Sequence, residues 1–413
     1  LFESFIGSKD TVGIIDKSPC FIFNVCVNEC SDSSFKYAFL TVKLSHIKLD
    51  IIPSVPLEKV TFSMTVPYDF RSNDRIFLNG YQSWTECREH FIDDEPIRLN
   101  LKQEAIRRVL PTSPYGDYDF VKYEKRKGCF HGFSYGYIRN LDQFDFFGSL
   151  SECFGYTIIR ANVPDRELIF ERDLEGVTID KEYTLIDVVN YRGKENEVYD
   201  KYFSAMNIPA PRVGRTNGYT TWYNYYQNIT EDIVTTDLES LSKVDSKIDI
   251  FQIDDGYQTA VGDWLSIDSK KFPNGMKYVA NRIHDKGMKA GLWLAPLSCQ
   301  VNSKIAKEHP DWLIRDEYGK KKLCGINWGN FYGLDTEKEE VKEHIRNFFS
   351  VVLNDWGYDM VKLDFLYSTC TVPRNGKSRG QLMCEAMDFI RECVGDKLIL
   401  GCGVPLHPAF GKV

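Results

Sequence analysis

A lysine and an aspartate share one short apolar stretch, Tyr358–Asp364, in the second half of the chain. The apolar residues predict a strand that Lys362 interrupts and that Asp364 closes. Buried lysine and aspartate are uncommon unless they are paired, so a structural ion pair is the simplest interpretation. However, the carboxyl ends of parallel barrel strands are where such folds place their chemistry. Asp364 is therefore a candidate nucleophile. Lys362 lies on the same strand face, and its positive charge would hold the pKa of the Asp364 carboxyl group low.

Other polar and aromatic residues also stand at the carboxyl ends of predicted strands. Asp254 and Asp255 come after one strand, Trp222 and Trp293 end two others, and Cys402 follows a fifth. Carboxylates accept hydrogen bonds from hydroxyl groups, and flat aromatic faces pack against the C–H side of a sugar ring. The joint pattern predicts a sugar-binding pocket. Because adjacent residues on extended chain point to opposite faces, we expect one of the two aspartates to point inward, namely Asp254.

A magnesium site is the alternative chemistry for the acidic pair. Asp254 and Asp255 could hold Mg²⁺ together with Asp263, as carboxylates do in other barrels. No phosphate-binding glycine loop accompanies them, so we expect neither a metal nor a cofactor. The scattered cysteines give no zinc-like spacing either.

The second half of the chain alternates predicted strands with predicted helices, which is typical of a parallel sheet with right-handed crossovers. The simplest such fold is a (β/α)₈ TIM barrel. Only five or six of its eight units are recognisable, so we expect a barrel that is incomplete at Val413. The expected strands are 218–222, 248–253, 290–294, 358–364 and 398–401, and the expected helices are 231–244, 274–284, 337–353 and 381–394.

The first half has a different pattern, with short alternating apolar runs that turn residues separate. Such runs predict an all-β sandwich over residues 1–205, with strands including 20–27, 39–52, 60–66 and 167–170. A helix at Glu197–Met206 and the Pro209–Pro211 segment predict the boundary, so that the barrel domain covers residues 206–413. Trp84, in the turn-like Asn79–Trp84 segment, is expected to pack in the core or between the domains.

Composition restricts the partners. A net charge of −8 and a pI near 5.5 argue against nucleic acid and anionic membranes, which both require a concentrated basic face. No apolar run reaches the length of a membrane-spanning helix. The twelve cysteines have no disulfide-like spacing, which favours reduced thiols and a cytoplasmic location. A homo-oligomer is left open.

Six motifs occur in an order that resembles glycoside hydrolase family 36, the α-galactosidase and melibiase group. The similarity extends over about residues 80–413. It implies an N-terminal β-supersandwich before the barrel, with Asp364 as the nucleophile and Asp254, Asp255 and Lys362 as residues that bind galactose hydroxyls. It also implies that Trp222 and Trp293 line the site that holds the galactose ring, and that Cys402 and Gly403 form a loop near C2 of the sugar. The motifs are Gly218–Asn224, Phe251–Tyr257, Lys271–Met276, Gly287–Trp293, His309–Trp312 and Val361–Asp364.

By this resemblance the protein is expected to be a retaining exo-glycosidase that releases terminal α-D-galactose from an oligosaccharide or glycoconjugate. A covalent glycosyl-enzyme on Asp364 would form, and a second carboxyl group would protonate the leaving oxygen. The family's acid/base aspartate lies beyond Cys402, and we expect it to fall after Val413.

Departures from the family pattern leave alternatives open. Leu294-Ala295-Pro296 stands where the family often has Glu-Pro, Leu366 replaces an asparagine, and an expected arginine is not evident near Asn327-Trp328. These changes and the C2 side around Cys402 keep an α-N-acetylgalactosaminidase as the first alternative. A sugar-binding chain without turnover is the second.

Overall fold

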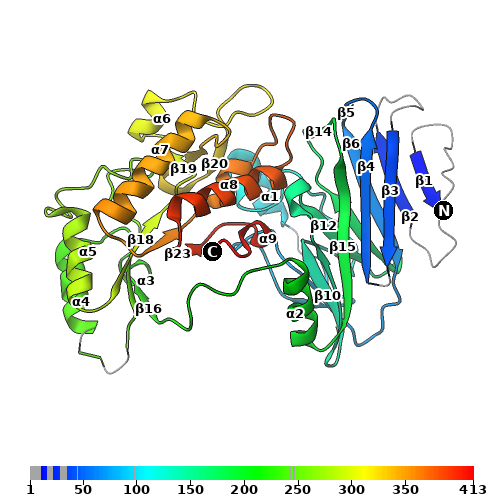
Figure 1. The fold of residues 1–413 in the computed structure, drawn as a ribbon, viewed down its shortest axis with the longest axis horizontal. Helices are drawn as coiled ribbons and strands as arrows, with labels where there is room; N and C mark the ends of the chain where they lie inside the picture. The colour runs from blue at the N-terminus through cyan, green and yellow to red at the C-terminus, as the bar shows by residue number, and fades with distance from the viewer. Residues whose placement is uncertain are drawn as a thin grey trace.

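The computed structural model describes residues 11–15, 22–27, 35–43, 45–96, 99–241, 243–244 and 247–413. In the first half, two antiparallel sheets face each other (Figure 1). One sheet has the order β1-β2-β6-β13-β12-β9 and the other β3-β4-β15-β11-β10-β7-β8. The strands are β1 (Thr11–Ile15), β2 (Ile22–Val27), β3 (Phe35–Lys43), β4 (His46–Pro53), β6 (Val60–Pro67), β7 (Arg75–Leu78), β8 (Glu89–Phe91), β9 (Cys129–Phe133), β10 (Tyr135–Asn140), β11 (Gln143–Ser149), β12 (Thr157–Asn162), β13 (Glu167–Arg172) and β15 (Tyr183–Gly193), with a small pair formed by β5 (Leu57–Glu58) and β14 (Thr178–Ile179).

Alternating apolar residues explain why these sheets pack together. In β6, Val60, Phe62 and Met64 are buried, and in β4 Leu49 and Ile51 are buried, all in one hydrophobic cluster. Alternate residues of a strand point to one face, so each sheet presents one apolar face to the other. The prediction of an all-β first half is consistent with this arrangement.

One predicted strand is wrong in its extent. The run 39–52 is a hairpin of β3 and β4, in which Lys43 pairs with His46. The apolar residues continue on both sides of the reversal, so their pattern alone did not reveal the turn, although Ser45 is a residue type that turns favour. The part of the predicted strand 20–27 that precedes Ile22 lies outside the described residues.

The second half contains one parallel sheet, in the order β16-β17-β18-β22-β23. Its strands are β16 (Gly218–Thr220), β17 (Ile250–Ile253), β18 (Lys289–Leu294), β22 (Met360–Leu363) and β23 (Leu398–Gly401). The helices are α3 (Trp222–Tyr225), α4 (Glu231–Leu241), α5 (Gly275–Asp285), α6 (Lys304–Glu308), α7 (Glu339–Ser350), α8 (Arg379–Val394) and α9 (Leu406–Ala409). The predicted parallel sheet and its main helices are therefore present, with ends shifted by a few residues.

Helix packing follows the apolar stripes of the sequence. Val341, Ile345, Phe348 and Phe349 of α7 recur at three- and four-residue spacing and are buried, as predicted. Ser378 begins α8 with a capping box, in which its hydroxyl group accepts from the Gln381 N–H group. Within the part of the chain that the structure describes, no helix is both long and apolar enough to cross a membrane.

The long connection between β18 and α7 has a small antiparallel sheet of its own. It consists of β19 (Ser298–Gln300), β21 (Phe331–Gly333) and β20 (Leu323–Gly325), in that order. The short turn between β20 and β21, Ile326–Asn330, contains Trp328 with positive φ (53°, ψ 28°) and Asn330 with φ 86°. This turn lies near η1 (Ser113–Tyr115) of the first half, because η1 contacts β20.

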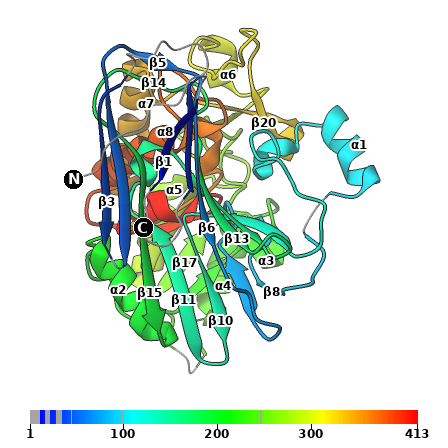
Figure 2. The same cartoon turned by 90° about the vertical axis from the view of Figure 1, so that its right-hand side faces the viewer.

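Helices α8 and α9 lie between the two halves and contact η2 (Glu152–Phe154) of the first half (Figure 1). In contrast, α1 (Leu101–Val109) extends away from the rest of the molecule (Figure 2). Another helix of the first half, α2 (Glu195–Ala205), matches the helix expected at Glu197–Met206.

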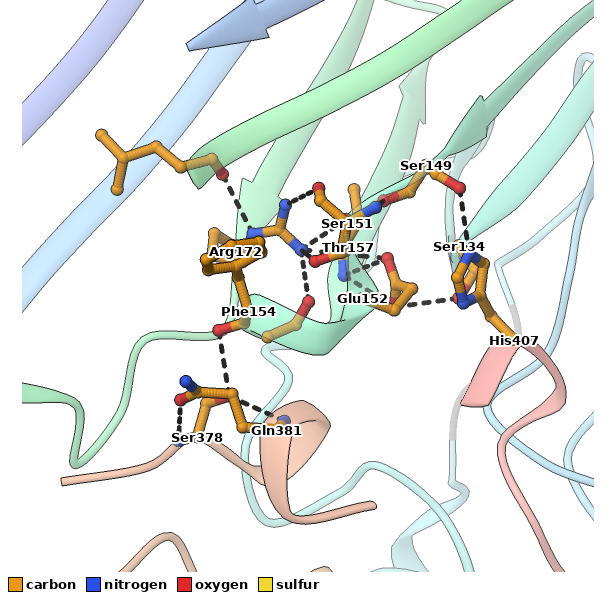
Figure 3. A network of polar contacts seen from close by, with 12 residues as sticks. Ser134, Ser149, Ser151, Glu152, Phe154, Thr157, Arg172, Ser378, Gln381 and His407 are labelled. Carbon is orange, nitrogen blue, oxygen red and sulfur yellow. Dashed lines mark hydrogen bonds and ion pairs between the residues drawn. The ribbon is translucent and has the colours of Figure 1, made fainter. Parts of the chain in front are cut away.

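A buried polar network joins these parts (Figure 3). The Arg172 guanidinium group donates to the Ser151 carbonyl at 3.1 Å and to Thr157 Oγ1 at 2.9 Å, and the Glu152 carboxylate lies 3.9 Å from it. From the second half, the Ser378 hydroxyl donates to the Phe154 carbonyl at 3.2 Å, and His407 Nε2 lies 3.1 Å from the Ser149 carbonyl. Buried groups that are satisfied in this way fix geometry, so the network sets the orientation of the two halves.

Candidate active site

A cavity of about 420 Å³ opens at the carboxyl ends of the parallel strands. Three aspartates and one lysine form its polar part, and aromatic rings form most of its walls. Both halves of the molecule contribute to it. The lining residues are Trp84, Tyr115, Trp222, Tyr223, Asp254, Asp255, Trp293, Asn327, Trp328, Lys362, Asp364, Phe365 and Cys402.

Asp364 follows β22 directly and lies at the cavity, where it is 8% exposed. Its Oδ1 accepts from the Phe365 N–H group at 2.8 Å, and its Oδ2 accepts from the Trp293 indole N–H group at 3.2 Å. Burial raises the pKa of this carboxyl group above its ordinary value, although the indole hydrogen bond and the Lys362 charge oppose the shift. The expected low pKa is therefore wrong, because desolvation outweighs the lysine.

Lys362 forms an ion pair with the carboxylate of Asp254 and not with that of Asp364. Its Nζ lies 2.7 Å from Asp254 Oδ2, and both side chains are largely buried. Burial, the largest single influence, lowers the pKa of the lysine, but the charge and hydrogen bond of Asp254 together with the charge of Asp364 outweigh it, and the pKa is raised. The ion pair therefore crosses from β22 to the end of β17, and Lys362 stays charged beside Asp364.

Asp254 and Asp255 both line the cavity, so the expectation that only Asp254 points inward is wrong. Asp255 Oδ2 accepts from Gln227 Nε2 at 2.6 Å and from the Trp328 indole N–H group at 2.8 Å. Its Oδ1 accepts from Gln258 Nε2 at 2.6 Å. Two-residue alternation fails here because β17 ends at Ile253, before the two aspartates.

Burial raises the pKa of Asp255, and its three side-chain donors oppose this shift. The carboxylate of Asp254 is held by further donors, because Oδ2 additionally accepts from Gln252 Nε2 at 3.0 Å and Oδ1 accepts from the Asp255 N–H group at 2.9 Å. Asp254 and Asp255 each accept at least three hydrogen bonds, with Lys362 as a charged donor to Asp254, whereas Asp364 accepts from the uncharged Trp293 indole and Phe365 N–H groups.

The proposed metal set does not come together. Asp263, the third member of that set, accepts the backbone N–H groups of Lys304 and Ile305 at 2.8 and 3.1 Å and therefore binds the start of α6. Among the described residues, no group of three or more His, Cys, Asp or Glu side chains has the geometry to hold a metal ion.

Trp222 and Trp293 line the cavity, as the sequence indicated. Trp293 is 2% exposed, and its ring lies against Trp264 and Trp328 at 5.7 and 5.9 Å between centroids. Trp222 does not end a strand, because β16 stops at Thr220 and Trp222 begins the short helix α3. The assumption that this segment continues as strand is therefore wrong, although the indole still reaches the cavity.

Six lining residues were not among the predicted site residues, and four of these belong to the second half. Trp328 and Asn327 come from the turn between β20 and β21, Phe365 follows Asp364, and Tyr223 follows Trp222. Phe365 and Tyr223 are direct neighbours of predicted residues, which was a usable signal. Nothing in the periodicity of the sequence indicates that the 326–330 turn reaches the cavity.

Two lining residues, Trp84 and Tyr115, come from the first half. Trp84 is 43% exposed at the cavity and packs against Phe365 at 4.8 Å and Tyr115 at 5.8 Å between centroids. Trp84 does contact the other half, as expected, but one side of its ring is available to a ligand.

Cys402 lines the cavity beside Asp364, and burial raises the pKa of its thiol to about 12. Gly403 does not line the cavity. It lies behind it with φ +58°, and an added Cβ would come within 3.0 Å of Trp84 Cη2 and of the Phe365 nitrogen. Gly403 therefore allows Trp84 and Phe365 to pack closely against this loop.

Comparison with known proteins gives this site a context. Residues 217–388 match the family model Melibiase. The α-galactosidase Mel36A of Lactobacillus acidophilus is 31% identical over 150 residues, which are 35% of this chain and 20% of the relative. The A type blood α-D-galactosamine galactosaminidase of Flavonifractor plautii is 30% identical over 149 residues, which are 34% of this chain and 14% of the relative. The matched parts thus span a fifth or less of these two relatives.

The fold is shared with a solved α-galactosidase, TtGalA from Thermus thermophilus. That structure, in complex with p-nitrophenyl α-D-galactopyranoside, has a TM-score of 0.68 and 26% identity, and the match covers 95% of this chain and 71% of that one. The same enzyme has been solved with stachyose. In its Melibiase segment, in its sequence relatives and in its fold, the chain is therefore similar to α-galactosidases of glycoside hydrolase family 36.

Proposed function

We propose that this chain carries the galactose-binding site and the nucleophile of a retaining α-galactosidase. The substrate class would be oligosaccharides or glycoconjugates with a terminal α-galactosyl group. Support comes from the α-galactosidase relatives and from the solved relative that binds p-nitrophenyl α-D-galactopyranoside and stachyose. The proposal rests mainly on one observation, namely that the three cavity carboxylates, Asp254, Asp255 and Asp364, differ in their ion-pair and hydrogen-bond partners.

Asp364 is the carboxylate that can attack. Asp254 is ion-paired with Lys362, and Asp255 accepts three side-chain hydrogen bonds. The donors to Asp364, the Phe365 N–H and Trp293 indole N–H groups, are uncharged. A nucleophile needs a free lone pair, and a weakly paired carboxylate with a raised pKa is more basic than an ion-paired one.

The remaining polar groups suit the binding of a sugar. Lys362 can donate to a ring hydroxyl, and the outer lone pairs of Asp254 and Asp255 can accept from one. Trp222, Trp293 and Trp328 provide flat apolar surface for the C–H face of the ring. Binding by several rigid groups would hold the anomeric carbon near Asp364.

The mechanism also requires a proton donor across the cavity from the nucleophile. Asp254 and Asp255 are unsuited to this role, because each accepts at least three hydrogen bonds that favour its ionised form, whereas a proton donor must be protonated. We therefore assign them to binding and assign no proton donor among the described cavity residues.

We propose the architecture that accompanies this function as well. Residues 1–205 would form a β-supersandwich domain, and residues 206–413 would form part of a catalytic (β/α)₈ barrel. The two facing antiparallel sheets and the five-stranded parallel sheet support this division.

Covalent trapping tests the nucleophile without needing a proton donor. A ring-fluorinated α-galactosyl fluoride loses fluoride without protonation, which allows the glycosyl ester to form, and its ring fluorine destabilises the oxocarbenium-like transition state of hydrolysis, so the adduct accumulates on the nucleophile. We expect one galactosyl adduct on the proteolytic peptide that contains Asp364. An adduct on another carboxylate would refute the assignment. Galactose binding without any adduct would instead favour the sugar-binding alternative.

The second candidate is an α-N-acetylgalactosaminidase. It is favoured by Cys402 beside Asp364, whereas the match to the α-D-galactosamine galactosaminidase of Flavonifractor plautii supports an amino sugar in general and not its N-acetylated form. Comparing p-nitrophenyl α-galactoside with its 2-acetamido analogue distinguishes the two. We expect the galactoside to react faster, and a preference for the analogue would establish the alternative.

A further inference from the structure

Tyr115 is the point where the first half of the molecule reaches the turn that carries Trp328. It ends η1, and its hydroxyl group accepts from the Ile326 N–H group at 2.7 Å and from the Asn327 N–H group at 3.3 Å. The same hydroxyl group donates to Asn327 Oδ1. One phenol thus meets two backbone donors and one side-chain acceptor of a single turn.

The turn at Ile326–Asn330 needs external support. Trp328 has φ 53° and ψ 28°, a left-handed conformation that side chains other than glycine disfavour. Asn330 also has positive φ, at 86°. Such conformations persist where surrounding contacts over-determine them, and they gather at binding sites.

The conformation of Trp328 matters because its indole reaches the cavity. Trp328 Nε1 donates to Asp255 Oδ2 at 2.8 Å. Its ring packs against Phe365 at 4.8 Å and Trp293 at 5.9 Å between centroids. If the turn relaxed, Asp255 would lose a donor, and the apolar wall beside Asp364 would move.

The position of Tyr115 is itself fixed on both sides. Its carbonyl accepts from Gln82 Nε2 at 2.5 Å, and its ring lies 5.8 Å from Trp84 and 6.2 Å from Tyr367. Gly325 faces it from β20, and a Cβ at that position would collide with the phenol. Figure 2 shows β20 beside the segment that follows α1, where the two parts of the chain meet.

We infer that Tyr115 is a positioning residue of the candidate active site: its hydroxyl group holds the Ile326–Asn330 turn so that Trp328 binds Asp255 and completes the sugar-binding wall. The identity of the ligand, a galactosyl group, rests on the proposed function. The hold on the turn itself is a property of the structure, and it can be measured without any ligand.

The first measurement is therefore hydrogen exchange of the free protein. Tyr115→Phe removes only the hydroxyl group, so the amides of Ile326 and Asn327 are expected to exchange at least about tenfold faster, because they lose their acceptor. The matched control is Tyr118→Phe, three residues along, whose ring stacks on Tyr123 at 5.1 Å. Unchanged exchange at Ile326 and Asn327 in Tyr115→Phe would overturn the inference.

A double-mutant cycle on D-galactose binding tests whether Tyr115 acts through Trp328. We expect Tyr115→Phe and Trp328→Phe each to weaken binding about tenfold, which corresponds to about 1.4 kcal/mol. The double variant should bind galactose no more weakly than the weaker of the two single variants. Both changes remove the same contribution to binding, since Tyr115 acts by holding the turn that places Trp328. Additive losses, about a hundredfold in the double variant, would refute action through Trp328.

Two further results complete the test. Gly325→Ala, whose methyl group displaces the phenol, should reproduce the Tyr115→Phe losses, and wild-type affinity in that variant would contradict the inference. With an aryl α-galactoside, Tyr115→Phe should raise KM more than it lowers kcat. If wild-type protein does not bind galactose, the proposed function fails, whereas the hydrogen-exchange result still decides the role of Tyr115.

Discussion

The floor of the cavity and its rim are built in different ways. The floor, which we define as Asp254, Asp255, Trp293, Lys362 and Asp364, comes from neighbouring strand ends of one parallel sheet. The rim, defined as Trp84, Tyr115, Tyr223, Asn327 and Trp328, comes from four separate segments. Asp254 is 1% exposed, whereas Tyr223 is 81% exposed.

This difference separates two tasks. The floor holds charges in a desolvated place, where each carboxylate needs partners and small displacements are costly. The rim offers aromatic surface that a ligand can cover. We therefore expect changes to the floor to affect chemistry and folding strongly, and changes to the rim to affect binding moderately.

The largest expected effect is on the nucleophile. Asp364→Asn should lower kcat/KM on an activated aryl α-galactoside by at least about a thousandfold, because the amide cannot form the glycosyl ester. Steady-state kinetics measure the loss, and circular dichroism checks that the fold is retained. A folded variant with wild-type turnover would show that the floor does not perform the chemistry.

Breaking the ion pair on the floor should cost stability. Lys362→Met leaves the Asp254 carboxylate buried without its cation, and unpaired buried charges typically cost about 3–5 kcal/mol. Chemical denaturation measures the change in the free energy of unfolding. Adding Asp254→Asn should restore much of the loss. A double variant as unstable as the sum of both single variants would argue against a coupled pair.

On the rim, Trp84→Ala should raise KM on an aryl α-galactoside about two- to tenfold and leave kcat nearly unchanged. Aromatic contacts of this kind contribute about 0.5–1.5 kcal/mol to binding, and they act equally on substrate and transition state. Tyr318→Ala removes an aromatic side chain that is 78% exposed and outside the cavity lining, so it serves as the control. A large fall in kcat for Trp84→Ala would erase the distinction between rim and floor.

The smallest effect is the pH dependence of stability. Because burial raises the pKa of Asp364 in the folded state, ionising it opposes folding, and this cost appears as pH rises above the unfolded value of about 3.9. Asp364→Asn does not titrate. Its unfolding free energy, minus that of wild type, should therefore grow between pH 4 and pH 7. A constant difference across that range would contradict the raised pKa.

Sequence reasoning recovered the floor more completely than the rim. Strand ends of a parallel sheet share one edge, so recognising β17, β18 and β22 was enough to bring Asp254, Asp255, Trp293, Lys362 and Asp364 together. The partners within this set were not predictable, because they depend on distances of a few ångströms. Lys362 was expected to serve Asp364, yet it pairs with Asp254.

The sequence by itself determined the two kinds of structure in the chain, the order of its parallel strands and the residues at their ends, because periodicity and local propensity act over short distances. Only the tertiary structure decided that Tyr115 meets the turn at Ile326 and that Trp84 packs against Phe365, each more than two hundred residues away in the sequence. The tertiary structure also decided that the pKa of Asp364 is raised and not lowered, since desolvation depends on all the groups that surround the carboxyl group. Contacts between distant segments leave no period in the sequence, and the rim is made of such contacts.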